Sequence, residues 1–138
     1  MQVIIDANVL ISCLIRPDGR TGRVREYIRA GGFVILYSRE TLAGFVNVIS
    51  RPRLIEKYQV QEQDVHAFRS LILLNGKRIK IKTKVSISRD PKDNDYLALA
   101  LDGKADFIVS GDGDLLSLSP FQGIPVIKPA DFIGILEK

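Results

Sequence analysis

The stretch ADFIVSGDGDLL, residues 105–116, joins a short apolar run to a turn that carries two carboxylates. The run QVIID at residues 2–6 repeats this arrangement, since its apolar residues end at Asp6, and FVILY at residues 33–37 is apolar and partly β-branched throughout. Strands that are apolar on both faces belong to a parallel sheet with helices on each side. The sequence therefore predicts an α/β protein with three α/β/α layers and a central parallel sheet.

The rest of the chain alternates between strand and helix patterns. Residues 77–88 (KRIKIKTKVSIS) alternate lysine with apolar side chains, which predicts an extended edge strand whose lysines protect it from unwanted pairing. Residues 53–60 are predicted to form a polar connection. Further strands are expected at residues 106–110 and 124–128, and helices near residues 8–17, 22–30, 38–49, 61–74, 90–102 and 129–136. No linker or repeat divides the chain, so residues 1–138 are expected to form one domain.

Bulk composition is that of a globular protein with a modest basic excess. The chain has 46% hydrophobic and 26% charged residues, a formal net charge of +4 and a pI near 9.3. Cys13 lies in an apolar run and is expected to be a buried thiol, while His66 has no second His or Cys beside it and does not indicate a zinc site. We find no signal peptide and no run long enough to span a membrane, so a cytoplasmic location is expected.

Four aspartates stand where strands are predicted to end or helices to begin: Asp6, Asp93, Asp112 and Asp114. Each has a local interpretation, because Asp caps helices and forms turns. In open parallel sheets, however, ligands bind outside the carboxyl ends of the strands, and a carboxylate at the end of a buried strand is costly unless something pairs it. One bound Mg²⁺ or Mn²⁺, which prefer oxygen ligands, would account for several of these acids together. A metal-dependent nuclease is therefore the leading hypothesis.

The motifs DANVL near the start and SRDPKDNDYLALALDGKADFIVSGDGDLL late in the chain resemble the PIN domain family, in particular the VapC-like toxins of bacterial toxin–antitoxin pairs. The resemblance extends over nearly the whole chain, including the RPRL segment at residues 51–54. It implies a Rossmann-like fold and an acidic cluster that holds Mg²⁺ or Mn²⁺ and cleaves RNA. It also implies a homodimer and a small antitoxin partner.

Carried over by position, the resemblance assigns roles to six residues. Asp6, Asp93 and Asp112 are expected to be catalytic and to hold the metal, with Asp114 as a further acid in the same loop. The polar residues expected to support this metal shell are Asn8 and Ser110.

The second acid of the family pattern is missing. Members usually carry Glu in the helix after the second strand, whereas SRETLAGF places Gly44 at that position. Glu40 lies one turn (~5 Å) earlier on the same helical face and is the candidate replacement, although an acid in the first turn also suits the helix dipole. The sequence leaves two alternatives open: a metal site completed by Glu40, or a weakened or inactive PIN domain that binds RNA or protein.

RNA binding requires cations around the acidic site. Arg16 and Arg20 flank the loop after the first predicted helix, and Arg51 and Arg53 follow the third, so these four are the candidate phosphate contacts. A phosphotransfer domain with Asp after the first strand is a third hypothesis. The haloacid-dehalogenase pattern requires an acid two residues after its nucleophile, and here that position is Asn8.

Overall fold

A five-stranded, entirely parallel sheet forms the centre of the computed structural model, which describes residues 1–138. The strand order is β3-β2-β1-β4-β5, and each neighbouring pair is parallel. The strands are β1 (Gln2–Ile5), β2 (Val34–Tyr37), β3 (Lys77–Arg78), β4 (Phe107–Val109) and β5 (Val126–Ile127). This arrangement confirms the predicted α/β class with a central parallel sheet.

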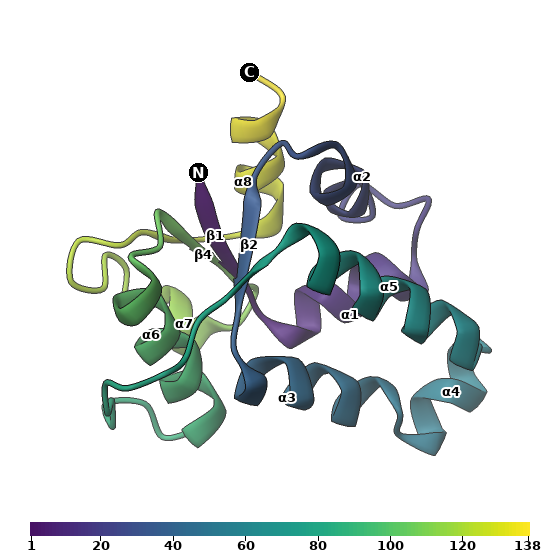
Figure 1. The fold of residues 1–138 in the computed structure, drawn as a ribbon, viewed down its shortest axis with the longest axis horizontal. Coiled ribbons are helices and arrows are strands. Elements are labelled where there is room, and N and C mark those ends of the chain that lie inside the picture. The colour runs from purple at the N-terminus through teal and green to yellow at the C-terminus, as the bar shows by residue number, and fades with distance from the viewer.

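The chain has eight helices, seven of which cover the two faces of the sheet, while α4 lies at the far end of α3 and contributes no buried residue (Figure 1). Helices α1, α2, α3, α5 and α8 contribute buried residues to one core cluster, whereas α6 and α7 contribute to the other. The helices are α1 (Ala7–Ile15), α2 (Arg23–Ala30), α3 (Arg39–Ile49), α4 (Pro52–Tyr58), α5 (Glu62–Asn75), α6 (Pro91–Gly103), α7 (Gly113–Leu116) and α8 (Pro129–Leu136).

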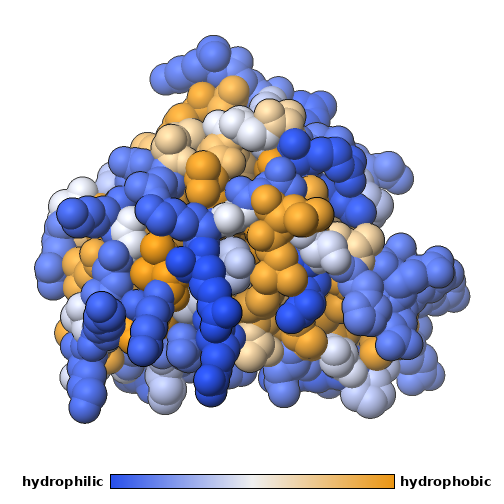
Figure 2. Space-filling view, in the orientation of Figure 1, coloured by the Kyte–Doolittle hydropathy of each residue, from blue (hydrophilic) through white to orange (hydrophobic).

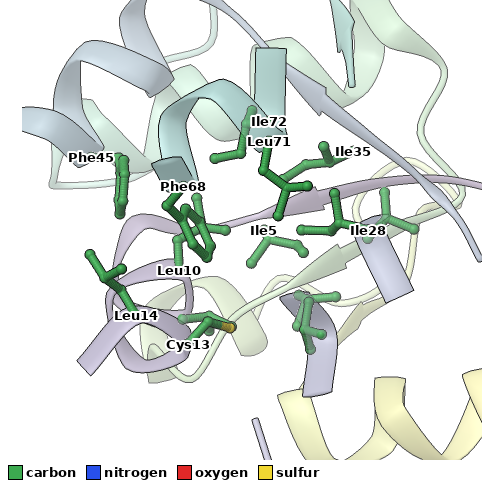
Figure 3. Close-up of a cluster of buried hydrophobic side chains, with 14 of the residues drawn as sticks. Ile5, Leu10, Cys13, Leu14, Ile28, Ile35, Phe45, Phe68, Leu71 and Ile72 are labelled. Atoms are coloured by element: carbon green, nitrogen blue, oxygen red, sulfur yellow. The ribbon is translucent and has the colours of Figure 1, made fainter. Parts of the chain in front are cut away.

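Alternation along the strands divides the core in two. In β1, Val3 and Ile5 belong to the larger cluster and Ile4 to the smaller one, since successive strand side chains point to opposite faces. Figure 3 shows part of the larger cluster, in which Ile5 and Ile35 of the sheet meet Phe68 of α5 and residues of α1 and α3. Both faces of the central strands are therefore buried, as their apolar composition predicts.

Cys13 and His66 lie as predicted. Cys13 is fully buried in the larger cluster, and burial raises the pKa of its thiol to about 12. His66 is exposed on α5 and lies 3.7 Å from the Glu62 carboxylate. Neither residue lies with the acidic residues of the strand ends.

The prediction of a polar connection at residues 53–60 is wrong, because this segment contains most of helix α4. Pro52 occupies the first helical position, where its missing N–H removes no intrahelical bond, and the helix ends at Gln59 in a left-handed conformation. Ile55 and Val60 of this region face the side chains of α3 and α5 around a surface hollow.

The long edge strand predicted over residues 77–88 is also wrong. Only Lys77 and Arg78 pair with β2, and the chain then crosses to α6. The Asp102 carboxylate accepts the backbone N–H groups of Lys82 at 2.7 Å and Thr83 at 2.9 Å, and Thr83 Oγ1 at 2.5 Å. These bonds replace the pairing that a longer strand would make.

No helix of the structure combines the length and the apolar character that crossing a membrane requires.

Replacing Asp102 with Asn should destabilise the fold by about 1 kcal/mol at pH 7, because hydrogen bonds to a charged acceptor are lost. Hydrogen bonds from Thr83 and Lys82 hold the pKa of Asp102 below its ordinary value. The stabilisation is therefore present above pH ~4 and fades as the pH falls through the folded-state pKa. Urea unfolding at pH 7 and pH 3 measures this, with the exposed Asp18→Asn as control. An equal deficit at both pH values would contradict the assignment.

Candidate functional site

The acidic site is built where β1 and β4 end side by side. Asp6 follows β1 and Ser110 follows β4, and the Asp6 N–H donates to the Val109 carbonyl at 3.1 Å. Two segments more than one hundred residues apart in sequence are thereby joined at one edge of the sheet. The carboxyl ends of parallel strands share this edge, which is where ligands bind in such sheets.

Asp6 is buried, with 4% of its surface exposed. One carboxylate oxygen accepts the Val9 N–H at 2.9 Å and so caps α1, and the other accepts the Ser110 hydroxyl. Burial raises the pKa of Asp6 above its ordinary value and the charge of Asp112 adds to this, although the bonds from Ser110 and Val9 oppose it.

Ser110 connects two of the acids. Its hydroxyl donates to Asp6 and accepts the Asp112 N–H at 3.0 Å, and the whole residue is buried. Asp112 in turn caps α7 by accepting the Asp114 N–H at 3.0 Å. Asp6 and Asp112 therefore cap helices, as the local interpretation predicts, and Ser110 also joins them at one edge of the sheet.

Asp93 enters from the first turn of α6 and is 6% exposed. It accepts the Ser88 hydroxyl at 3.2 Å. Burial, followed by the nearby charge of Asp112, raises the pKa of Asp93 to about 6. The structure thus brings Asp6, Asp93 and Asp112 together, with Asp112 acting electrostatically on both of the others.

Tyr96 is part of this site and was missed from the sequence. It lies one turn after Asp93 on α6, and its hydroxyl oxygen accepts the Ala7 N–H at 2.8 Å. Burial raises its pKa, and the charges of Asp6 and Asp93 add to this effect. The three-residue spacing from Asp93 placed Tyr96 on the same helical face, which is the sequence signal that could have identified it.

Glu40 lies near the α6 residue Asp95. It is exposed in the first turn of α3, and its charge raises the pKa of Asp95, after burial as the larger cause. Asp95, which the sequence reasoning did not single out, therefore extends the acidic group toward α3.

The remaining predicted residues lie at the margin of the site. Asp114 is exposed and forms an ion pair with Arg89 at 3.4 Å. Asn8 is exposed and lines a shallow groove together with Ser12 and Asp112.

Gly44 lies in the second turn of α3 with free space around it. A Cβ atom added there would meet no heavy atom within 4 Å. Steric crowding therefore does not explain the glycine, and a longer side chain at this position is compatible with the fold.

The four candidate arginines divide into two pairs. Arg16 and Arg20 are exposed in the turn after α1. Arg51 and Arg53 stand at the start of α4, so the 11-residue α3, about 16 Å long, separates them from the sheet edge (Figure 1). The structure does not bring this second pair to the acids.

The donor set suits a hard divalent cation, although it is incomplete for a closed metal centre. Every available ligand is an oxygen, and the raised pKa values of Asp6 and Asp93 reflect burial and crowding that a cation would relieve. No three Asp, Glu, His or Cys side chains lie close enough together to hold an ion as they stand. Mg²⁺ commonly binds one or two carboxylates and keeps several waters, so the residues present fit this ion.

The fold and this acid-lined sheet edge define a PIN domain, and the chain belongs to that family: the PIN domain model matches residues 2–114. Members are generally nucleases that use divalent metal ions. A curated relative, the uncharacterized protein MJ1680 of Methanocaldococcus jannaschii, is 33% identical over 150 aligned positions that cover all of this chain and 93% of the relative.

Two solved structures share the fold. PAE2754 from Pyrobaculum aerophilum superposes with a TM-score of 0.62 at 17% identity, covering 99% of this chain and 90% of that one. VapBC2 from Rickettsia felis, solved bound to a DNA fragment from its promoter, gives a TM-score of 0.58 at 13% identity, covering 93% of this chain and 98% of that one.

Replacing Asp93 with Asn should stabilise the metal-free protein at pH 7.5 by on the order of 1–2 kcal/mol. Since the pKa of Asp93 is about 6 in the folded state, the native protein binds an extra proton between pH ~4 and ~6. Wild-type stability therefore falls as the pH rises through this window, and the substitution removes that loss.

Urea unfolding in EDTA at pH 4 and pH 7.5 measures this effect. The control is Asp18→Asn, an exposed residue whose charge does not contribute to the Asp93 pKa, and it should show no pH-dependent gain. A constant difference between Asp93→Asn and wild type across the two pH values would refute the explanation.

Proposed function

We propose that this PIN domain is a metal-dependent endoribonuclease of the VapC-like toxin type. The observation that carries the proposal is the meeting of Asp6, Asp93 and Asp112 at one sheet edge, where burial and mutual repulsion raise the pKa values of the first two. Such crowding opposes folding, and a bound cation would relieve the repulsion.

Asp6, Asp93 and Asp112 would hold Mg²⁺ or Mn²⁺. When bound, the ion would lower the pKa of an attacking water and stabilise negative charge on the leaving oxygen of the phosphodiester. The chain's own contribution is positional. Ser110 sets the carboxylate of Asp6 and the backbone of Asp112, and Ser88 orients Asp93.

Two acids have weaker cases. Glu40 lies near Asp95 and could extend the shell toward α3, whereas Asp114 already pairs with Arg89 in the open. We therefore place Asp114 at the edge of the site, where its backbone N–H bonds to Asp112 and orders the loop. Asn8 would supply a polar contact in the adjoining groove.

The partners proposed for the chain are an RNA substrate, a cognate antitoxin protein and a second copy of the chain. Fold similarity to VapBC2 supports the antitoxin partner.

Purified protein should cleave single-stranded RNA in Mg²⁺ or Mn²⁺ and lose that cleavage in EDTA. Asp6→Asn should reduce the rate at least 100-fold, since a buried ligand charge disappears while the side chain keeps its size. Gel assays on a labelled oligoribonucleotide measure this, with Asp18→Asn as the control. Undiminished cleavage by Asp6→Asn would overturn the assignment.

A second candidate function, a non-catalytic binding module, is favoured by one observation. Gly44 leaves space where the family carries an acid, so the metal shell is one ligand short. Metal affinity separates the two candidates.

Gly44→Glu should tighten Mn²⁺ binding about tenfold or more, equivalent to ~1.4 kcal/mol, because a carboxylate is added where the space is free. Gly44→Gln is the matched control, since it adds the same length without charge and both variants gain helix propensity. Calorimetric titration measures the affinities. Wild-type protein that binds no Mn²⁺ at millimolar concentration, while Gly44→Glu does, would favour the binding module.

A further inference from the structure

A basic surface beside the acids is not explained by the metal site. Arg39 and Arg78 each line two adjoining hollows, one shared with Lys80 and the other with Arg69. We call this surface, defined by Arg39, Arg69, Arg78 and Lys80, the arginine groove. Its two hollows measure about 430 and 310 Å³, which is within the size range of small-ligand sites.

The arginine groove lies at the same sheet edge as the acids. Arg39 begins α3 two residues after the end of β2, and Arg78 ends β3, where the Ile79 N–H donates to the Tyr37 carbonyl at 2.8 Å. Strand β2 neighbours β1, and β3 is the next strand outward. With strands ~4.8 Å apart, the backbone at the groove lies about 5–10 Å from the end of β1, where Asp6 stands.

Glu40 joins the groove to the acidic site. It lines the hollow with Arg39 and Lys80, and its charge reaches Asp95 on the helix that carries Asp93. The groove therefore adjoins the helix that carries Asp93.

The cations of the groove have no partners within the protein. All four are exposed, and none takes part in an ion pair or in a side-chain hydrogen bond. Glu40 is the single acid in the lining. Four unpaired cations around one acid favour a polyanion, and guanidinium groups match phosphate oxygens in a forked geometry.

Apolar side chains lie between the arginines. Leu42 and Val46 of α3 face Leu73 of α5, which is 38% exposed. Figure 2 shows the side of the molecule on which α5 and the chain after β3 lie in front, and there hydrophilic side chains surround a band of hydrophobic ones. Exposed bases can pack on apolar and guanidinium surfaces, whereas those of a duplex are stacked inside it.

We infer that the arginine groove binds the phosphates and bases of single-stranded RNA and leads the strand to the acidic site. The inference deepens the proposed function and rests on it in taking RNA as the substrate. It also replaces the expectation that Lys80 protects a sheet edge, because β3 pairing ends at Arg78 and Lys80 lines the groove.

The test is binding of a fluorescein-labelled 12-nucleotide oligouridylate, followed by anisotropy in EDTA over a series of salt concentrations. The groove variant is Arg39→Gln with Arg78→Gln. The control is Arg51→Gln with Arg53→Gln, which loses the same charge at the far end of α3. Circular dichroism melting checks that both variants fold.

The groove variant should bind at least tenfold more weakly than wild type, and the control less than twofold. Its slope of log affinity against log salt should shrink by about 1.4, since two phosphate contacts on a single strand are lost. In Mg²⁺ cleavage, its KM should rise with kcat little changed.

Equal weakening in both variants, or no RNA binding by wild-type protein in EDTA, would overturn the inference. Tighter binding of a poly-glutamate peptide of equal charge than of the oligouridylate would overturn it in favour of an acidic protein partner. The outcomes also separate the two proposals. If the groove variant binds RNA more weakly than wild type but no protein cleaves RNA, the nuclease proposal alone is rejected. If the groove variant binds RNA as tightly as wild type and cleavage depends on Asp6, the groove proposal alone is rejected.

Discussion

The hydroxyl of Ser110 joins two aspartates whose carboxylates repel each other. It donates to Asp6 and accepts the Asp112 N–H, and it can do so because β1 and β4 are neighbours whose ends coincide. Burial makes the repulsion stronger, since the low dielectric of the interior screens charge poorly. The site is thus maintained by the sheet at a cost in stability, which is common where residues are kept for function.

Two physical roles coincide in these aspartates. Asp6 caps α1 and Asp112 caps α7, so each would be useful even in a protein without a ligand. Helix N-termini also carry partial positive charge, which partly offsets the burial of a carboxylate. This explains how an acidic cluster of this kind can persist in the metal-free fold.

Local patterns were sufficient to predict most of the fold. The apolar runs ending at Asp6 and Ser110 gave the parallel sheet, and Pro129 marked the start of α8. Interactions between distant segments were not predictable in this way. Asp102 draws the chain away from β2, so the edge strand is shorter than its alternating pattern suggested, and α4 is helical in a segment that is polar by composition.

The same distinction applies to the candidate site. The acids could be identified because each follows a recognisable strand or precedes a recognisable helix. Spacing from Asp93 could have suggested Tyr96, but its bond to the Ala7 N–H depends on how α6 packs against the sheet. Ser88 could not be identified, because its bond to Asp93 depends on how the chain before α6 folds. The juxtaposition of Arg39 with Arg78 likewise requires the parallel pairing of β2 and β3.

The chain between β3 and α6 is fastened to that helix at both ends. Asp102 binds it near the helix C-terminus through Lys82 and Thr83, and Asn94 exchanges two hydrogen bonds with Ser88 near the N-terminus. This strap and α6 therefore form one mechanical unit. Insertions or deletions in the strap would displace the Ser88 hydroxyl that orients Asp93. The number of residues in the strap is therefore constrained, although almost none of it belongs to the sheet.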